Sequence, residues 1–156
     1  MKAPPLRLEN YFFPRVLVEA NPNFANTDTN QEVPIKLSAQ PQVSVNTKDP
    51  LRFRLILKIR VAYDEDHPSP YGIELDAVGF FRVDETVPED QRTTLVHVNG
   101  STILFAAARE FLLGVTGRGP WGNVMLPAWS FHPGVHMEEP PKEGLAEEES
   151  IPDQSG

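Results

Sequence analysis

Residues 51–84 read LRFRLILKIRVAYDEDHPSPYGIELDAVGFFRVD and contain the clearest strand pattern in the sequence. Two segments in it, 51–64 and 72–84, alternate apolar and mostly charged side chains at every second position. Such alternation is typical of strands that bury one face. The residues between the two segments have the composition of a loop. We therefore expect two antiparallel strands, with Arg60 close to Asp76 across the ladder.

Two further strands are expected upstream. Residues 6–20 are rich in Leu, Val, Tyr and Phe, and Pro14 favours an edge position or a bulge for that strand. Residues 33–45 form a weaker strand pattern, which Pro41 interrupts. The polar connection between them, residues 21–32, is long for a compact domain, and loops of that length are often functional.

One helix is expected over residues 102–116, with Ser101 as its N-cap and glycines at its end. Arg109 and Glu110 are its only charged residues. An apolar surface this wide exceeds what one sheet face covers, so the helix is expected to be buried on two sides, the second being a subunit interface. The predicted interface residues are Ile103, Phe105, Ala106, Phe111 and Leu112.

Length and composition indicate one globular domain. The chain has 156 residues, 40% of them hydrophobic, and no cysteine. No apolar segment follows Lys2 as in a signal peptide, and no apolar run approaches the roughly 20 residues that span a bilayer. These features predict a cytoplasmic protein that does not insert into membranes.

The charge is uneven along the sequence. Residues 138–156 hold seven acids and one base, a net charge of −6, which leaves −2 for everything before them. We expect a folded domain over 1–135 and a disordered acidic tail over 136–156. No basic face of the size that nucleic acid requires is evident, so no nucleic-acid partner is expected.

The sequence offers no convincing catalytic or metal site. His132 and His136 have a helical metal-ligand spacing, but Pro133 and the following glycine between them favour two solvated histidines. The acids and histidine of residues 64–67 lack the remaining features of a calcium loop. The glycine-rich residues at the end of the predicted helix do not indicate a phosphate-binding loop, because such a loop precedes a helix. No enzyme activity and no cofactor are expected.

Five large apolar residues are not easily placed in a core. Phe24 lies in a polar loop, and Val78 and Phe80 fall on the charged face of their strand. Trp121 and Trp129 follow the predicted helix. Each residue alone is more often part of the core, but together they indicate exposed apolar surface of the kind that marks a binding site.

Several short segments resemble the SecB protein-export chaperones. Residues 103–110, ILFAAARE, resemble the helix signature of that family, roughly N-I-L-F-P-Y-A-R-E, with Ala106 and Ala107 in place of Pro-Tyr. The similarity spans residues 6–133. The other similar segments are Val16 to Pro22, Gly79-Phe80-Phe81, Arg118-Gly119 and Leu126-Pro127.

The resemblance implies an α+β subunit, in which one long helix packs on one face of a four-stranded antiparallel sheet. It also implies a homo-oligomer, a dimer of dimers whose helices meet at the centre. Family members bind unfolded polypeptide clients and pass precursors to the Sec translocation motor ATPase. The positions matching the peptide groove are Phe24, Val33, Ile35 and Leu37, to which the strand pattern adds Val78 and Phe80. Glu19 and Glu74 match acids that contact the motor.

The chain also departs from the family pattern. Arg15 reverses the charge of another motor-binding acid. The second helix of the family should follow Phe131, where Pro133 and a glycine stand instead, and the C-terminal motor-binding segment is not recognisable. Three functions are therefore weighed: a general holdase for Sec-dependent export, a dedicated SecB-like chaperone for one partner such as an antitoxin, and an oligomeric structural module without a client.

Overall fold

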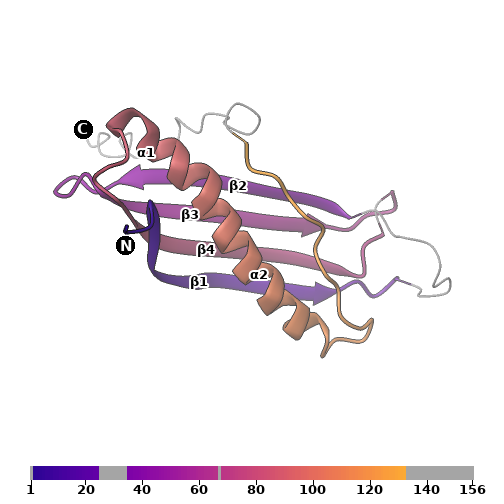
Figure 1. The fold of residues 1–156 in the computed structure, drawn as a ribbon. Coiled ribbons are helices and arrows are strands. Elements are labelled where there is room, and N and C mark those ends of the chain that lie inside the picture. Colours follow the sequence, from indigo (N-terminus) through magenta and orange to yellow (C-terminus); the bar gives the residue numbers. More distant parts are fainter. Residues whose placement is uncertain (1, 25–34, 67, 133–156) are drawn as a thin grey trace, which may run out of the picture.

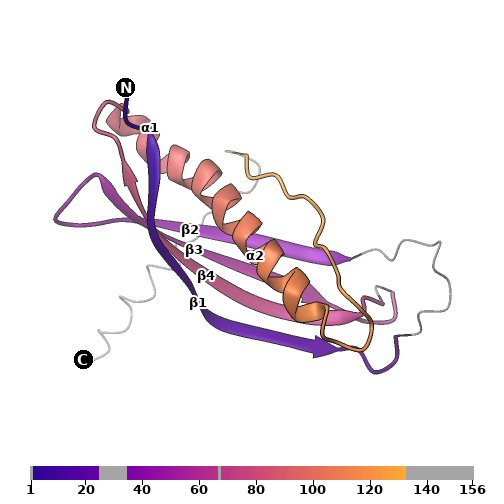
Figure 2. The same cartoon turned by 60° about the horizontal axis from the view of Figure 1, so that its bottom comes forward.

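The computed structural model describes residues 2–24, 35–66 and 68–132. Within these residues, four strands form one antiparallel sheet in the spatial order β1-β4-β3-β2 (Figure 1). The strands are β1 (Leu6–Ala20), β2 (Lys36–Val45), β3 (Arg52–Ala62) and β4 (Tyr71–Val83). A helical run covers one face of the sheet, so the expected α+β class is confirmed (Figure 2).

The central pair, β3 and β4, has the predicted antiparallel register. Leu57 lies opposite Ala77, and Ile59 lies opposite Leu75. The alternation places one row of each strand in the core and the other row on the opposite face of the sheet. Arg60 and Asp76 form an ion pair at 2.9 Å, as the sequence predicted.

Strand β1 is an edge strand with two irregularities. Its register against β4 shifts between Leu8 and Asn10 and again between Phe12 and Arg15, and the second shift contains Pro14. A proline cannot donate a ladder hydrogen bond, so it is tolerated at an edge or a bulge. The expected edge position and bulge are both confirmed.

The helix starts earlier than the sequence indicated. A continuous helical run comprises α1 (Glu89–Leu95), a π-helical segment η1 (Val96–Gly100) and α2 (Ser101–Thr116). The prediction of Ser101 as an N-cap was wrong, because this residue has helical torsion angles and is fully buried. Helix α1 contains no buried residue, so its sequence has no apolar periodicity that predicts a helix. The negative charge of Glu89 in the first turn stabilises α1 through the helix dipole.

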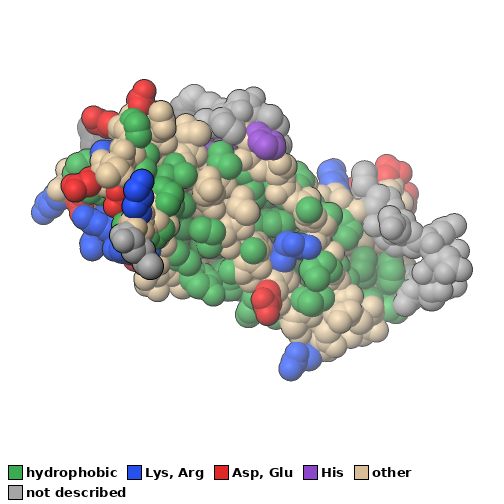
Figure 3. Space-filling model, viewed as in Figure 1, with side chains coloured by type: hydrophobic (Ala, Val, Ile, Leu, Met, Phe, Trp, Pro, Cys, Tyr) green, Lys and Arg blue, Asp and Glu red, His purple; other side chains and the backbone are tan. Residues whose placement is uncertain are grey.

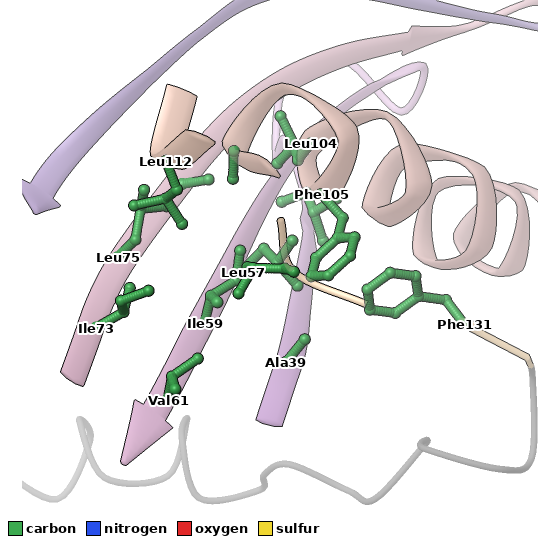
Figure 4. Close-up of a cluster of buried hydrophobic side chains, with 14 of the residues drawn as sticks. Ala39, Leu57, Ile59, Val61, Ile73, Leu75, Leu104, Phe105, Leu112 and Phe131 are labelled. Carbon is green, nitrogen blue, oxygen red and sulfur yellow. The ribbon is translucent and has the colours of Figure 1, made fainter. Parts of the chain in front are cut away.

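The core lies between α2 and the sheet. Leu104, Phe105 and Leu112 of α2 point toward Leu57, Ile59 and Leu75 of the central strands (Figure 4). Complete burial of such side chains stabilises the fold by about 1.5–3 kcal/mol each. Gly79 allows the helix to approach closely, since a Cβ atom there would lie 3.0 Å from Leu104 Cδ2. The core therefore requires large apolar side chains at most positions and a glycine where the helix lies closest to β4.

Two glycines near the end of α2 provide a test of this packing. A Cβ atom on Gly119 would lie 2.5 Å from the hydroxyl oxygen of Tyr71, which is buried and hydrogen-bonded. We expect Gly119→Ala to lower the free energy of unfolding by about 1–3 kcal/mol. The matched control is Gly114→Ala, because open space surrounds that position inside the helix.

The control should keep the stability or raise it by up to about 1 kcal/mol. Urea unfolding of the two variants beside the unsubstituted chain measures both effects. A Gly119→Ala chain with an unchanged urea midpoint would contradict the tight packing around Tyr71.

Candidate functional site

An irregular segment, residues 120–132, crosses the sheet on the same side as α2. We call it the closing segment. It runs from the end of α2 past β4 and β3 toward β2 (Figures 1 and 2). Leu126 and Phe131 anchor it in the core, with exposed fractions of 1% and 2%. Phe131 also packs edge-on against Phe105 of α2, at a ring-centroid distance of 5.9 Å.

Hydrogen bonds hold the closing segment without regular secondary structure. The backbone N–H of Trp121 donates to the hydroxyl of Tyr71 at 3.0 Å, and this hydroxyl lies 2.9 Å from the Gly122 carbonyl. Arg109 donates from Nε to the Leu126 carbonyl at 2.9 Å. Arg109, one of the two charged residues of α2, therefore has a structural role. Tyr71 fixes the beginning of the closing segment, Arg109 fixes its middle, and the buried Phe131 fixes its end.

The turn after β1 is tied to the closing segment. The indole N–H of Trp121 donates to the Asn21 carbonyl at 3.0 Å, and the ring of Phe24 packs edge-on against Trp121 at 5.3 Å. Asn21 is buried and donates from its side chain to the Ser69 carbonyl at 3.0 Å. These contacts place the half-buried Phe24 at the end of the sheet where β1 ends and β4 begins.

Half-buried apolar side chains surround this end of the sheet and continue along β2. All but one of them pack on the core while keeping part of their surface free; the exception, Phe24, packs on Trp121. They come from the turn after β1, from β2 and the residue before it, and from the closing segment. We call them the apolar border: Phe24, Ile35, Leu37, Trp121, Val124 and Trp129. Strand β2 pairs with β3 alone among the described strands, so Ile35 and Leu37 of the apolar border lie beside an open sheet edge.

The predicted peptide-binding residues that the structure describes lie on two different surfaces. Phe24, Ile35 and Leu37 belong to the apolar border, whereas Val33 lies outside the described residues. Val78 and Phe80 lie on the opposite face of the sheet, which α2 does not cover, because their positions alternate with the buried row of β4. One continuous surface therefore does not contain all six.

The acid predicted to contact a translocation motor has a partner within the chain. Arg15 of β1 forms a short ion pair with Glu74 of β4. The hydrogen bond from Arg15, reinforced by its charge, lowers the pKa of Glu74, and the same pair raises the pKa of Arg15. Glu19, the second predicted acid, is exposed at the end of β1. The charge reversal at position 15 thus neutralises Glu74 locally.

Of the residues predicted for the oligomer interface, two are buried within the subunit and three are exposed. Phe105 and Leu112 are buried inside the subunit, with exposed fractions of 4% and 0%. Ile103, Ala106 and Phe111 are exposed on α2. The surface over α2 carries many hydrophobic and few charged side chains, whereas a group of charged side chains lies near α1 (Figure 3).

Strand β1 extends that exposed surface of α2. The ring of Phe13 packs against Phe111 at 5.1 Å and against Tyr11 at 5.8 Å. Tyr11 and Val16 remain 43% and 40% exposed. The sequence pattern did not identify these two β1 residues, because the register shifts of β1 interrupt the period-2 alternation that assigns faces.

Groups for acid–base or metal chemistry do not converge in the described part of the chain. No three His, Asp or Glu side chains there could hold a metal ion. His132 is exposed, and His136 lies outside the described residues. The helices that the structure describes include none long and apolar enough to cross a membrane. The notable features are apolar surfaces, which define a class of sheet-and-helix protein suited to binding other polypeptides.

Comparison with protein families identifies the chain. The model of the family "Preprotein translocase subunit SecB" matches residues 2–135, and the chain belongs to this family of chaperones. No curated protein matches the sequence.

The fold comparison agrees. The chain resembles a SecB-like chaperone of Mycobacterium tuberculosis, solved in complex with a ChAD peptide from the HigA1 antitoxin. The TM-score is 0.62 at 14% identity, over 81% of this chain and 91% of the other. A protein of unknown function from Streptococcus agalactiae matches at a TM-score of 0.45 and 9% identity, over 79% and 97% of the two chains. The family and the fold support a chaperone role.

Proposed function

We propose that this chain is a holdase, which keeps unfolded polypeptide clients extended along the apolar border. The observation behind the proposal is the position of Ile35 and Leu37 along the edge strand β2, together with Phe24, which packs on Trp121 where β1 ends. Side chains that are anchored in the core but half exposed form a preorganised apolar surface, and a sheet edge offers free backbone groups to an extended chain.

The chemistry of an unfolded client fits this arrangement. Its apolar side chains occur at irregular spacing, so the receptor must be long, apolar and tolerant of sequence. Each side chain that the client buries contributes roughly 1.5–3 kcal/mol, so several such contacts give useful affinity without a specific pocket. The Mycobacterium tuberculosis chaperone of similar fold was solved in complex with a peptide from an antitoxin, which supports polypeptide binding by this chain.

Sec-dependent export is the first candidate role for the bound clients. The family description names a preprotein translocase subunit, which supports delivery of precursors to the translocation motor. Glu19 is then the exposed acid available to that motor, since Glu74 already pairs with Arg15.

A dedicated chaperone for one partner is the second candidate. The neutralisation of Glu74 by Arg15 favours it, because an acid engaged within the chain is less available to a basic partner. The antitoxin peptide bound by the Mycobacterium tuberculosis protein supports it as well. The number of unrelated clients that are protected distinguishes the two candidates.

We also propose that the chain self-associates, as a dimer or a dimer of dimers, through α2 and β1. Tyr11, Val16, Ile103 and Phe111 are each between 38% and 43% exposed. Isolated apolar residues on a surface need no explanation, but a connected group that spans two elements marks an interface. A second copy of the same surface is its simplest complement.

The holdase proposal predicts the effect of charges at the apolar border. The double variant Phe24→Asp with Ile35→Asp should lose most suppression of aggregation of two unrelated unfolding proteins, because carboxylates oppose apolar contact. Light scattering measures the protection, and thermal unfolding shows that the variant is folded. The control is Leu17→Asp with Gln91→Asp, two exposed positions outside the border and outside β2, which should keep full activity.

A folded double variant that protects both clients as well as the unsubstituted chain would refute the proposed site. Should the variant unfold, the milder pair Phe24→Ser with Ile35→Thr repeats the comparison. Protection of one specific partner alone would favour the dedicated chaperone.

The interface proposal predicts a change of mass. The unsubstituted chain should elute at two or four times the mass of 17.5 kDa at micromolar concentration, measured by light scattering. Ile103→Glu with Phe111→Glu should shift it toward the monomer, because like charges would face each other across the interface. The control Glu110→Gln, at an exposed position of the same helix, should keep the assembly. A strictly monomeric unsubstituted chain would refute the interface.

A further inference from the structure

The sheet face that α2 leaves open carries an unusual combination of side chains. We call it the open face (Figure 2). Strand β3 presents four basic residues and no acid there: Arg52, Arg54, Lys58 and Arg60. The whole chain has a net charge of −8, so this basic row is opposite in sign to the net charge of the protein.

The acids of β4 do not neutralise all of these cations. Asp76 pairs with Arg60, and Glu74 pairs with Arg15 of β1. Arg54 and Lys58 have no ion-pair partner among the described residues. Two cations on a central strand are therefore available to a negatively charged ligand.

Apolar side chains lie between and beside these two cations. Ile56 of β3 and Phe12 of β1 both lie opposite Val78, so the three form a row across three strands. Phe80, opposite Arg54, packs against Phe12 at a ring-centroid distance of 6.2 Å. Phe12 and Phe80 are 45% and 37% exposed. Exposed aromatic pairs of this kind mark binding surfaces.

A hollow adjoins the aromatic pair. It has a volume of about 520 Å³ and is lined in part by Asn10, Arg52, Arg54 and Phe80. The open face therefore offers an apolar row, a concave end and two unpaired cations. A ligand that matches it is a polypeptide with several carboxylates and a few aliphatic side chains.

We propose that the acidic C-terminal segment of this same chain, residues 138–156, docks on the open face. This segment has a net charge of −6 and two large aliphatic residues, Leu145 and Ile151, with three consecutive glutamates between them. The carboxylates meet Arg54 and Lys58, and the aliphatic side chains meet Phe12, Val78 and Phe80. The segment thereby covers apolar surface that would otherwise be exposed.

The length of the chain permits this contact. After His132 the chain continues for 24 residues, which span up to about 80 Å when extended. Four strands at about 4.8 Å spacing make a sheet much narrower than that. Because the segment is attached to its site, its effective concentration is on the order of millimolar, so individually weak contacts suffice.

The full chain allows a direct test, because it contains no cysteine. A spin label on Ser150→Cys should broaden backbone amide signals of the open face, near Arg54, Lys58 and Phe80, and not those of α2. Reversing two charges, Arg54→Glu with Lys58→Glu, should reduce this broadening at least about fivefold, and 0.5 M salt should reduce it as well. The control Arg118→Glu, at the end of α2, should leave it unchanged.

A mixed sample separates contact within a chain from contact between copies. In it, one chain carries the spin label but no isotope, and the other carries the isotope but no spin label, so any broadening arises between copies. Broadening within the same chain, lost on charge reversal, supports the proposal. Broadening on α2, broadening spread evenly over the surface, broadening between copies alone, or broadening insensitive to charge reversal each overturns it. None of these outcomes depends on client binding at the apolar border.

Discussion

The packing of α2 on the central strands β3 and β4 holds the subunit together and determines which apolar surfaces stay exposed. Leu104 and Leu112 are fully buried against a row of side chains that are also fully buried, and Gly79 allows the helix to come close. Because a single helical run covers a four-stranded sheet, much apolar surface lies at the margins of that contact. The closing segment covers part of it, and the remainder is the apolar border and the exposed edge of α2 and β1.

The period-2 pattern of β3 and β4 was sufficient to predict their pairing, their buried faces and the Arg60–Asp76 ion pair. It also identified Val78 and Phe80 as apolar residues on a charged face, but not their partner Phe12, because two register shifts in β1 remove the alternation. The start of the helical run was missed because α1 buries no residue. The closing segment has no periodicity at all; its position follows from Tyr71, Arg109 and Trp121, and such long-range hydrogen bonds have no local sequence signal.

The two faces of the sheet differ in chemistry, and that difference bears on the two candidate roles. The covered face leads to the apolar border and to the exposed side of α2 and β1, where we propose client binding and self-association. The open face is basic and aromatic, and its Glu74 is engaged by Arg15. Membership of the SecB family supports the chaperone role, and Arg15 is the open-face charge that departs from the resemblance described above. Specialisation of a common scaffold through surface charge requires no change in the core.

We propose that an extended client lies along β2 and the closing segment. Amide hydrogen exchange of the full chain, with and without a saturating unfolded client, tests it most directly. We expect slower exchange in residues 36–45 and 120–132, and unchanged exchange in the turn that joins β2 to β3. Slower exchange confined to the open face, or no slowing in β2 while the client is bound, would show that the client lies elsewhere.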